Sequence, residues 1–148
     1  MKTEYSVNSN VGKVRADKVN EDSYKHVRTD WEEIFVVCDG MGGHAGGAMA
    51  SKVAVDSVVD YISKKKYSDA RQVLSDALSF ANIQILGTAK ENPELKGMGT
   101  TACVLLVKDN KAYIAHCGDS RIYLYVAKKK RLYRLTKDHS LVQSMVDS

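Results

Sequence analysis

The chain has 148 residues, the length of one domain with room for a buried core, and 44% of them are hydrophobic and 27% charged. One proline and ten glycines exclude a fibrous or disordered chain. The net charge of +4 comes largely from two lysine-rich runs at residues 64–66 and 128–131. No aromatic residues interleave them, so the sequence predicts no nucleic-acid partner.

Three widely spaced cysteines, Cys38, Cys103 and Cys117, lie in apolar runs without a C-x-x-C pair. This pattern predicts buried free thiols rather than a disulfide framework or a zinc site. The first residues lack the apolar core of a signal peptide, and no stretch approaches the length of a membrane span. We therefore expect a soluble, cytoplasmic protein with no membrane partner.

The first half predicts one strand followed by two helices. Residues 34–38 form a continuous apolar run, typical of a strand buried on both faces. Apolar residues then recur at helical spacing over residues 45–64 and again over 69–89. Pro93 follows the second stretch, where a helix cannot continue.

The second half predicts a meander of strands at residues 100–107, 112–117, 122–126 and 132–135, with a last helix starting near 138. The chain contains no repeat and no linker, so we expect a single unit, residues 1–148. Strands, two consecutive helices and further strands indicate an α+β layered domain with helices outside the sheets.

Three polar clusters lie beside strand-like runs: residues 20–22 lead into the short run 23–27, residues 39–44 follow the run 34–38, and residues 118–121 interrupt the later strands. Carboxylates are costly to crowd together unless a positive charge lies between them. Hard divalent cations such as Mg²⁺ and Mn²⁺ take carboxylate, carbonyl and water oxygens as ligands. Gly40, after Asp39, lets its own carbonyl approach such an ion. The clusters therefore predict a site for Mg²⁺ or Mn²⁺ rather than for zinc.

Each cluster also has an ordinary structural interpretation. Glu21 and Asp22 are acceptable turn or edge-strand residues, Asp39-Gly40 is a common turn, and Arg121 can pair with Asp119. Of the histidines, we expect His26 at the surface, His116 in the core, and His139 in local hydrogen bonds. The metal interpretation gains weight because the three clusters occur together, each beside an apolar run.

A dinucleotide-binding motif is the main rival interpretation. Gly40-x-Gly42-x-x-Ala45 follows a strand and opens a helix, and Asp60 lies twenty residues after Gly40. Asp60 falls inside the predicted helix, however, so it cannot reach a ribose. Asp39 would also place a negative charge beside the pyrophosphate, so we reject this interpretation.

Taken together, the motifs resemble those of the type 2C metal-dependent protein serine/threonine phosphatases in their bacterial form. The resemblance spans nearly the whole chain and rests on five ordered motifs: Arg15 with Asn20-Glu21-Asp22, residues 35–44, Gly99-Thr100-Thr101, Gly118-Asp119-Ser120-Arg121, and Leu135-Thr136-x-Asp138-His139-Ser140. It implies a layered α-β-β-α sandwich of antiparallel sheets flanked by helices.

The resemblance also implies ligands for two core Mn²⁺ or Mg²⁺ ions and a third, weaker one. Asp39 would bridge the core ions, and the Gly40 carbonyl would bind one of them. Glu21 would be a ligand or lie next to one, Asp22 would act beside it through water, and Asp119 would hold the third ion.

Two catalytic roles follow from the same resemblance. His44 is the candidate general acid, since an imidazole titrates near neutral pH. Other branches of the family carry the histidine directly after Asp-Gly, where this chain has Met41. Arg15 is the candidate phosphate ligand, but the longer spacing before residue 20 leaves Lys18 as an alternative.

The implied activity is hydrolysis of phosphoserine and phosphothreonine on proteins, the substrates of serine/threonine kinases, by a water activated between the ions. The family continues into later strands whose Ser-Asp-Gly and Asp-Asn motifs complete the metal pair. We therefore expect the 148-residue chain to be the N-terminal part of one such domain and inactive alone. We also expect it to self-associate through exposed strand edges and uncovered apolar faces of 100–107 and 112–117. A non-catalytic binding or assembly module is the alternative.

Overall fold

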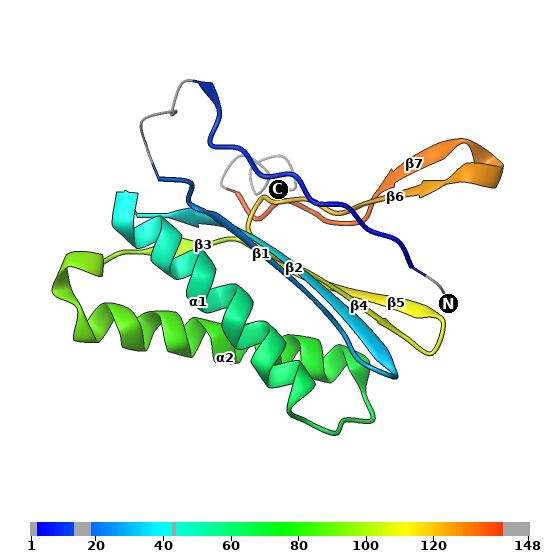
Figure 1. Ribbon diagram of the computed structural model, residues 1–148, viewed down its shortest axis with the longest axis horizontal. Coiled ribbons are helices and arrows are strands. Elements are labelled where there is room, and N and C mark those ends of the chain that lie inside the picture. The colour runs from blue at the N-terminus through cyan, green and yellow to red at the C-terminus, as the bar shows by residue number, and fades with distance from the viewer. Residues whose placement is uncertain (1–2, 14–18, 43, 141–148) are drawn as a thin grey trace.

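A computed structural model of the chain describes residues 3–13, 19–42 and 44–140, and Figure 1 shows their arrangement. The main sheet is antiparallel, with the order β1-β2-β4-β5, while the short β3 pairs with the end of β2. Its strands are β1 (Asp22–Arg28), β2 (Glu32–Met41), β3 (Gly99–Thr100), β4 (Ala102–Lys108) and β5 (Lys111–Cys117). The β4–β5 connection is a two-residue turn in which Asp109 and Asn110 both have positive φ, as tight hairpins favour.

Two helices, α1 (His44–Ser63) and α2 (Ala70–Glu91), cover one face of this sheet (Figure 1). Both agree with the predicted helices to within two residues. Asp69 caps α2 by accepting hydrogen bonds from the backbone of Arg71 and Gln72, and a 3-10 turn, η2 (Pro93–Leu95), follows its end. The core lies between this helix layer and the sheet; its fully buried members include Ile34, Val36, Cys38, Val58, Ile62, Val104 and Leu106.

The described residues cover the opposite face of the sheet only in part. Val37 is 52% exposed and Phe35 is half-buried, so the prediction of a strand buried on both faces was wrong for β2. The reason is that α1 and α2 pack on the other face. The N-terminal segment crosses the open face and places the Tyr5 ring 5.8 Å from the Phe35 ring (Figure 1).

A separate two-stranded hairpin follows the sheet. It consists of β6 (Tyr123–Val126) and β7 (Arg131–Arg134), joined through a 3-10 turn, η3 (Ala127–Lys129). Apolar exposure concentrates here, at Tyr123, Leu124, Tyr125, Leu132, Tyr133 and Leu135. On the helix side, β4 buries Ala102, Val104 and Leu106. On its other face Cys103 is buried, whereas Leu105 and Val107 are half-buried, so the expected uncovering of this strand is only partial.

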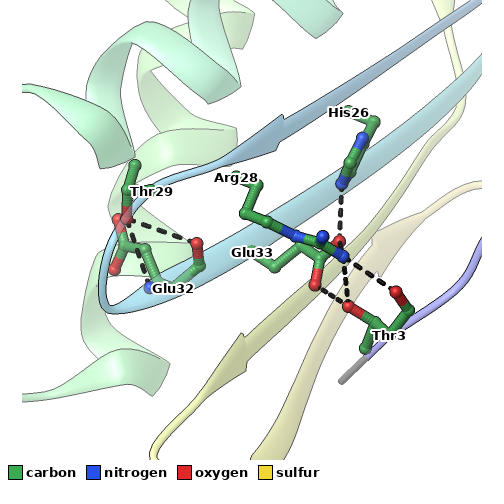
Figure 2. Close-up of polar contacts among 6 residues, drawn as sticks. All are labelled: Thr3, His26, Arg28, Thr29, Glu32 and Glu33. Carbon is green, nitrogen blue, oxygen red and sulfur yellow. Dashed lines mark hydrogen bonds and ion pairs between the residues drawn. The ribbon is translucent and has the colours of Figure 1, made fainter. Parts of the chain in front are cut away.

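Far from the predicted site, Glu33 is a buried carboxylate at the closed end of the β1–β2 hairpin (Figure 2). It accepts hydrogen bonds from the Thr3 hydroxyl, from Arg28 at 2.7 Å and from His26 at 2.7 Å. Burial raises the pKa of this carboxyl, but the three donors outweigh that effect and lower it to about 2. His26, expected at the surface, is therefore largely buried in this cluster.

The antiparallel sheet with helices on one face confirms the α+β class. Cys38 and Cys103 are buried free thiols, as predicted, but Cys117 is exposed because it ends the edge strand β5. None of the helices described here is long and apolar enough to cross a membrane. Residues 138–140 are not helical, and the rest of the last predicted helix lies outside the described residues.

Candidate metal centre

The pairing of β1 with β2 brings the first two polar clusters together. In this register Asp22 lies directly opposite Asp39. Glu21 immediately precedes β1, and its carbonyl oxygen accepts a hydrogen bond from the Gly40 backbone N–H at 3.1 Å. The segments of residues 20–22 and 39–42, separate in sequence, thus form one end of the sheet.

The third cluster, residues 118–121, contacts the same end of the sheet at Thr101, the residue that follows β3. The Thr101 backbone N–H donates to the Asp39 carbonyl at 2.9 Å, and the Thr101 hydroxyl accepts from the Asp39 N–H at 3.0 Å. The same hydroxyl lies 2.6 Å from the hydroxyl of Ser120, the residue after Asp119. Asp119 is therefore held near Asp39.

The electrostatics of Asp39 show how closely these carboxylates are grouped. Burial raises the pKa of its carboxyl, and the neighbouring Asp22, Asp119 and Glu21 raise it further. Each of these three carboxylates disfavours a negative charge on Asp39. The four carboxylates therefore repel one another when all are ionised. A divalent cation among them would reverse this shift by favouring the charged forms.

Glu21 supplies the strongest sign that the site is built for a ligand. Its Oε1 atom is buried and has no hydrogen-bond partner among the described residues. An unpaired buried carboxylate oxygen is costly, so such an atom calls for a partner such as a cation.

Glycines make the close packing around Glu21 possible. A Cβ atom at Gly47 would lie 2.5 Å from Glu21 Oε1. A Cβ atom at Gly40 would lie 2.0 Å from the Gly47 carbonyl oxygen and 2.7 Å from that of Glu21. Larger residues at either position would therefore push the Glu21 segment away from Asp39.

The donor set fits Mg²⁺ or Mn²⁺, which accept carboxylate and carbonyl oxygens and retain waters. Within the described ranges, no three histidine, cysteine or acidic side chains are placed to hold an ion by themselves. Backbone carbonyls, waters or further ligands must therefore complete the coordination. Structural zinc sites, by contrast, are closed by four side chains, usually cysteine and histidine.

Several predicted site residues are not brought to this cluster within the described residues. His44 begins α1, but its side chain lies outside what the structure describes, as do Arg15 and Lys18. Arg121 does not pair with Asp119: it makes a two-pronged ion pair with Asp138, at 3.0 and 2.6 Å.

The two later histidines lie beside each other at the segment after β5. The rings of His116 and His139 stack with centroids 4.6 Å apart. His116 pairs with the Lys137 carbonyl at 2.7 Å, so it is partly buried and hydrogen-bonded rather than a core residue. The His139 ring accepts from the Gly118 N–H at 3.3 Å, which confirms its local role.

Sequence reasoning missed three contributors to the site: Thr101, Ser120 and Gly47. Thr101 and Ser120 lie within motifs that the sequence analysis singled out, but their contact joins residues 19 apart. The proximity of Gly47 to Glu21 depends on how α1 leaves β2. Only the fold reveals either contact.

Comparison with known proteins is consistent with this geometry. The chain matches the protein phosphatase 2C family over residues 11–143. It is 35% identical over 144 residues to the serine/threonine protein phosphatase PstP of Mycobacterium tuberculosis, covering 97% of this chain and 26% of that protein. It is also 35% identical over 147 residues to the protein phosphatase PhpP of Streptococcus pneumoniae, covering 97% of this chain and 58% of that protein.

Solved structures show the same relationship. The catalytic domain of PstP in complex with two manganese ions matches 87% of this chain and 54% of its own, with 33% identity and a TM-score of 0.74. The serine/threonine phosphatase Stp1 from Staphylococcus aureus matches 87% of this chain and 52% of its own, with 34% identity and a TM-score of 0.77. The chain thus spans less than two thirds of each of these relatives. It belongs to the protein phosphatase 2C family.

Proposed function

We propose that the chain is the N-terminal part of a single phosphatase domain that hydrolyses phosphoserine and phosphothreonine on proteins with Mn²⁺ or Mg²⁺. The observation that carries this proposal is the buried, unpartnered Oε1 of Glu21 beside the crowded carboxyl of Asp39. Relatives named as protein phosphatases support it, among them the serine/threonine phosphatase PstP, whose catalytic domain was crystallised with two manganese ions.

The proposed ligands divide between the segments that meet at this end of the sheet. Asp39 and the Gly40 carbonyl would hold the core pair of ions, and Glu21 would be a ligand or lie next to one. Asp22 acts through water, and Asp119 binds the third, weaker ion. When bound, the ions would lower the pKa of a water and offset charge on the phosphoryl oxygens.

Proton transfer and phosphate binding are assigned to residues near the same segments. His44, at the start of α1, donates a proton to the leaving alkoxide. Arg15 binds the phosphate by paired N–H groups, with Lys18 as the alternative cation. The substrates are phosphorylated proteins made by serine/threonine kinases, and the proposed location is the cytoplasm.

The 148-residue chain alone is proposed to be inactive, because the carboxylates in the part of the chain that the structure describes do not complete two ion sites. A second candidate function, a binding or assembly module without catalysis, is favoured by the exposed apolar residues of the β6–β7 hairpin. The two functions differ in their dependence on Asp39, since a binding module has no need of its charge.

The test is Asp39→Asn in a form of the protein that includes the later segments present in its relatives. We expect this variant to lose Mn²⁺-dependent turnover of a phosphothreonine peptide, because it removes the negative charge that would hold both core ions. Asp30→Asn, at the far end of the β1–β2 hairpin, is the control and should retain full turnover. Near-normal turnover by Asp39→Asn would rule out the two-ion assignment.

A further inference from the structure

The Thr101 hydroxyl is the shared point of two segments that carry acidic residues. It accepts from the Asp39 N–H at 3.0 Å and lies 2.6 Å from the Ser120 hydroxyl. A hydroxyl has one donor and two acceptor positions, so both contacts can form at once. Ser120 is adjacent in the chain to Asp119, while Asp39 lies on β2. One side chain therefore links β2 to the segment after β5.

The backbone just before Asp119 packs closely against Thr101. Gly118 has φ +96°, and a Cβ atom there would lie 2.7 Å from the Thr101 methyl carbon. On its other side, Gly118 exchanges two hydrogen bonds with His139, through the ring at 3.3 Å and the backbone at 3.0 Å. Gly118, before Asp119, thus contacts both Thr101 and His139. Ser120, after Asp119, is anchored by its hydroxyl.

Asp39 has backbone contacts that transmit this restraint. Its carbonyl accepts from the Thr101 N–H at 2.9 Å and from the Thr100 hydroxyl at 3.0 Å. Together with the bond from its own N–H, three hydrogen bonds tie Asp39 to residues 100–101. A shift of Thr101 would therefore move Asp39, whereas a shift of Ser120 would move mainly Asp119.

We propose that Thr101 and Ser120 are positioning residues that set the separation of the Asp39 and Asp119 carboxylates, and so couple the weaker divalent-cation site to the core site. The proposal rests on the proposed function, because it assigns a purpose to hydroxyls around that site. Partners that orient metal ligands typically change metal affinity by about 10- to 100-fold when they are removed.

The test is a titration with Mg²⁺ into the millimolar range, followed by NMR, of isotopically labelled protein in the form that includes the later segments present in its relatives. Diamagnetic Mg²⁺ shifts the carboxyl signals of the side chains that bind it without broadening more distant signals, so the Asp39 and Asp119 side-chain carboxyl signals report the two sites separately. Ser120→Ala should weaken binding at Asp119 by about 10-fold and leave Asp39 unchanged. Thr101→Val should weaken both sites, and Thr101→Ser, which retains the hydroxyl, should restore them.

Thr88→Val is the matched control, because it removes a hydroxyl that bonds only within α2, to the Gln84 carbonyl. It should leave both titrations unchanged. If neither Ser120→Ala nor Thr101→Val changes the Mg²⁺-dependent shifts that the wild-type protein shows, the positioning role is wrong and the proposed function stands. If Mg²⁺ shifts neither the Asp39 nor the Asp119 carboxyl signal in the wild-type protein, the proposed metal site is wrong, and the coupling fails with it.

Discussion

Gly47 leaves no room for a side chain between α1 and Glu21. A methyl group there would meet Glu21 Oε1 at 2.5 Å, and the flexible Glu21 side chain would move away from it. We predict that Gly47→Ala lowers Mn²⁺ affinity by about 10-fold. Its thermal stability should change little, because the gain of about 1 kcal/mol from replacing a helical glycine offsets the cost of crowding.

Gly87 of α2 is the matched control for this substitution. A Cβ atom there would meet nothing within 4 Å, so Gly87→Ala should raise the melting temperature and leave Mn²⁺ affinity unchanged. Calorimetric titration with Mn²⁺ and thermal unfolding of both variants make the comparison. Equal Mn²⁺ affinities for Gly47→Ala and the wild-type chain would contradict the role assigned to Glu21.

Glu33 makes a residue-scale prediction about acid stability. Its pKa in the folded chain is about 2, below its ordinary value of 4.5, so its ionised form stabilises the fold above about pH 4.5. This contribution should disappear as the pH falls from about 4.5 to about 2. Glu33→Gln should lower the free energy of unfolding at neutral pH by about 2 kcal/mol, and the difference from the wild-type chain should shrink over that pH window.

Urea unfolding at a series of pH values measures this difference. Glu94→Gln, on the exposed turn after α2, is the control and should match the wild-type chain throughout. A Glu33→Gln difference that stayed constant down to about pH 2 would show that the carboxyl is not held ionised by Thr3, Arg28 and His26.

At the scale of elements, β5 is an edge strand with an open side among the described residues. A groove of about 770 Å³ runs between β5 and Leu74 and Leu78 of α2. Backbone groups on an open edge pair readily with another chain. We predict that the 148-residue chain self-associates through β5, and that Ala112→Lys shifts it toward a monomer, because a charge on the strand disfavours pairing.

Light scattering gives the mass of each species. Ile83→Lys, which adds a charge to an exposed apolar residue of α2, is the control and should leave the mass unchanged. The prediction is wrong if the wild-type chain is monomeric. It is also wrong if Ile83→Lys lowers the mass and Ala112→Lys does not, because β5 is then not the interface between copies.

The positions of helices and strands were easier to predict from the sequence than the burial and pairing of their side chains. Helical spacing gave both helices to within two residues, since one stripe of each packs on the sheet and α2 has a cap at Asp69. The apolar run at residues 34–38 predicted β2 but not the exposure of Val37, because the run does not reveal which face the helices cover. Arg121 was paired with the wrong carboxylate, since Asp138 approaches only after the β6–β7 hairpin folds back.

At the scale of the whole molecule, the two ends of the β1–β2 hairpin carry acidic residues in opposite electrostatic settings. At one end, donors surround Glu33 and lower its pKa. At the other, carboxylates surround Asp39 and raise its pKa. The described residues satisfy the first cluster themselves, whereas the second retains an unpartnered Glu21 oxygen that a cation would satisfy. Sequence motifs pointed to the second end, but the unpartnered Glu21 oxygen depends on packing between β1 and α1.

Anomalous scattering from crystals of the protein grown with Mn²⁺, recorded at the manganese absorption edge, tests the proposed metal centre most directly. We predict a manganese peak within about 2.5 Å of an Asp39 carboxylate oxygen, with Glu21 Oε1 facing it. In Asp39→Asn crystals grown in the same way, that peak should be lost. Manganese bound elsewhere in the wild-type protein, for instance at the His116–His139 pair, with none beside Asp39, would contradict the assignment.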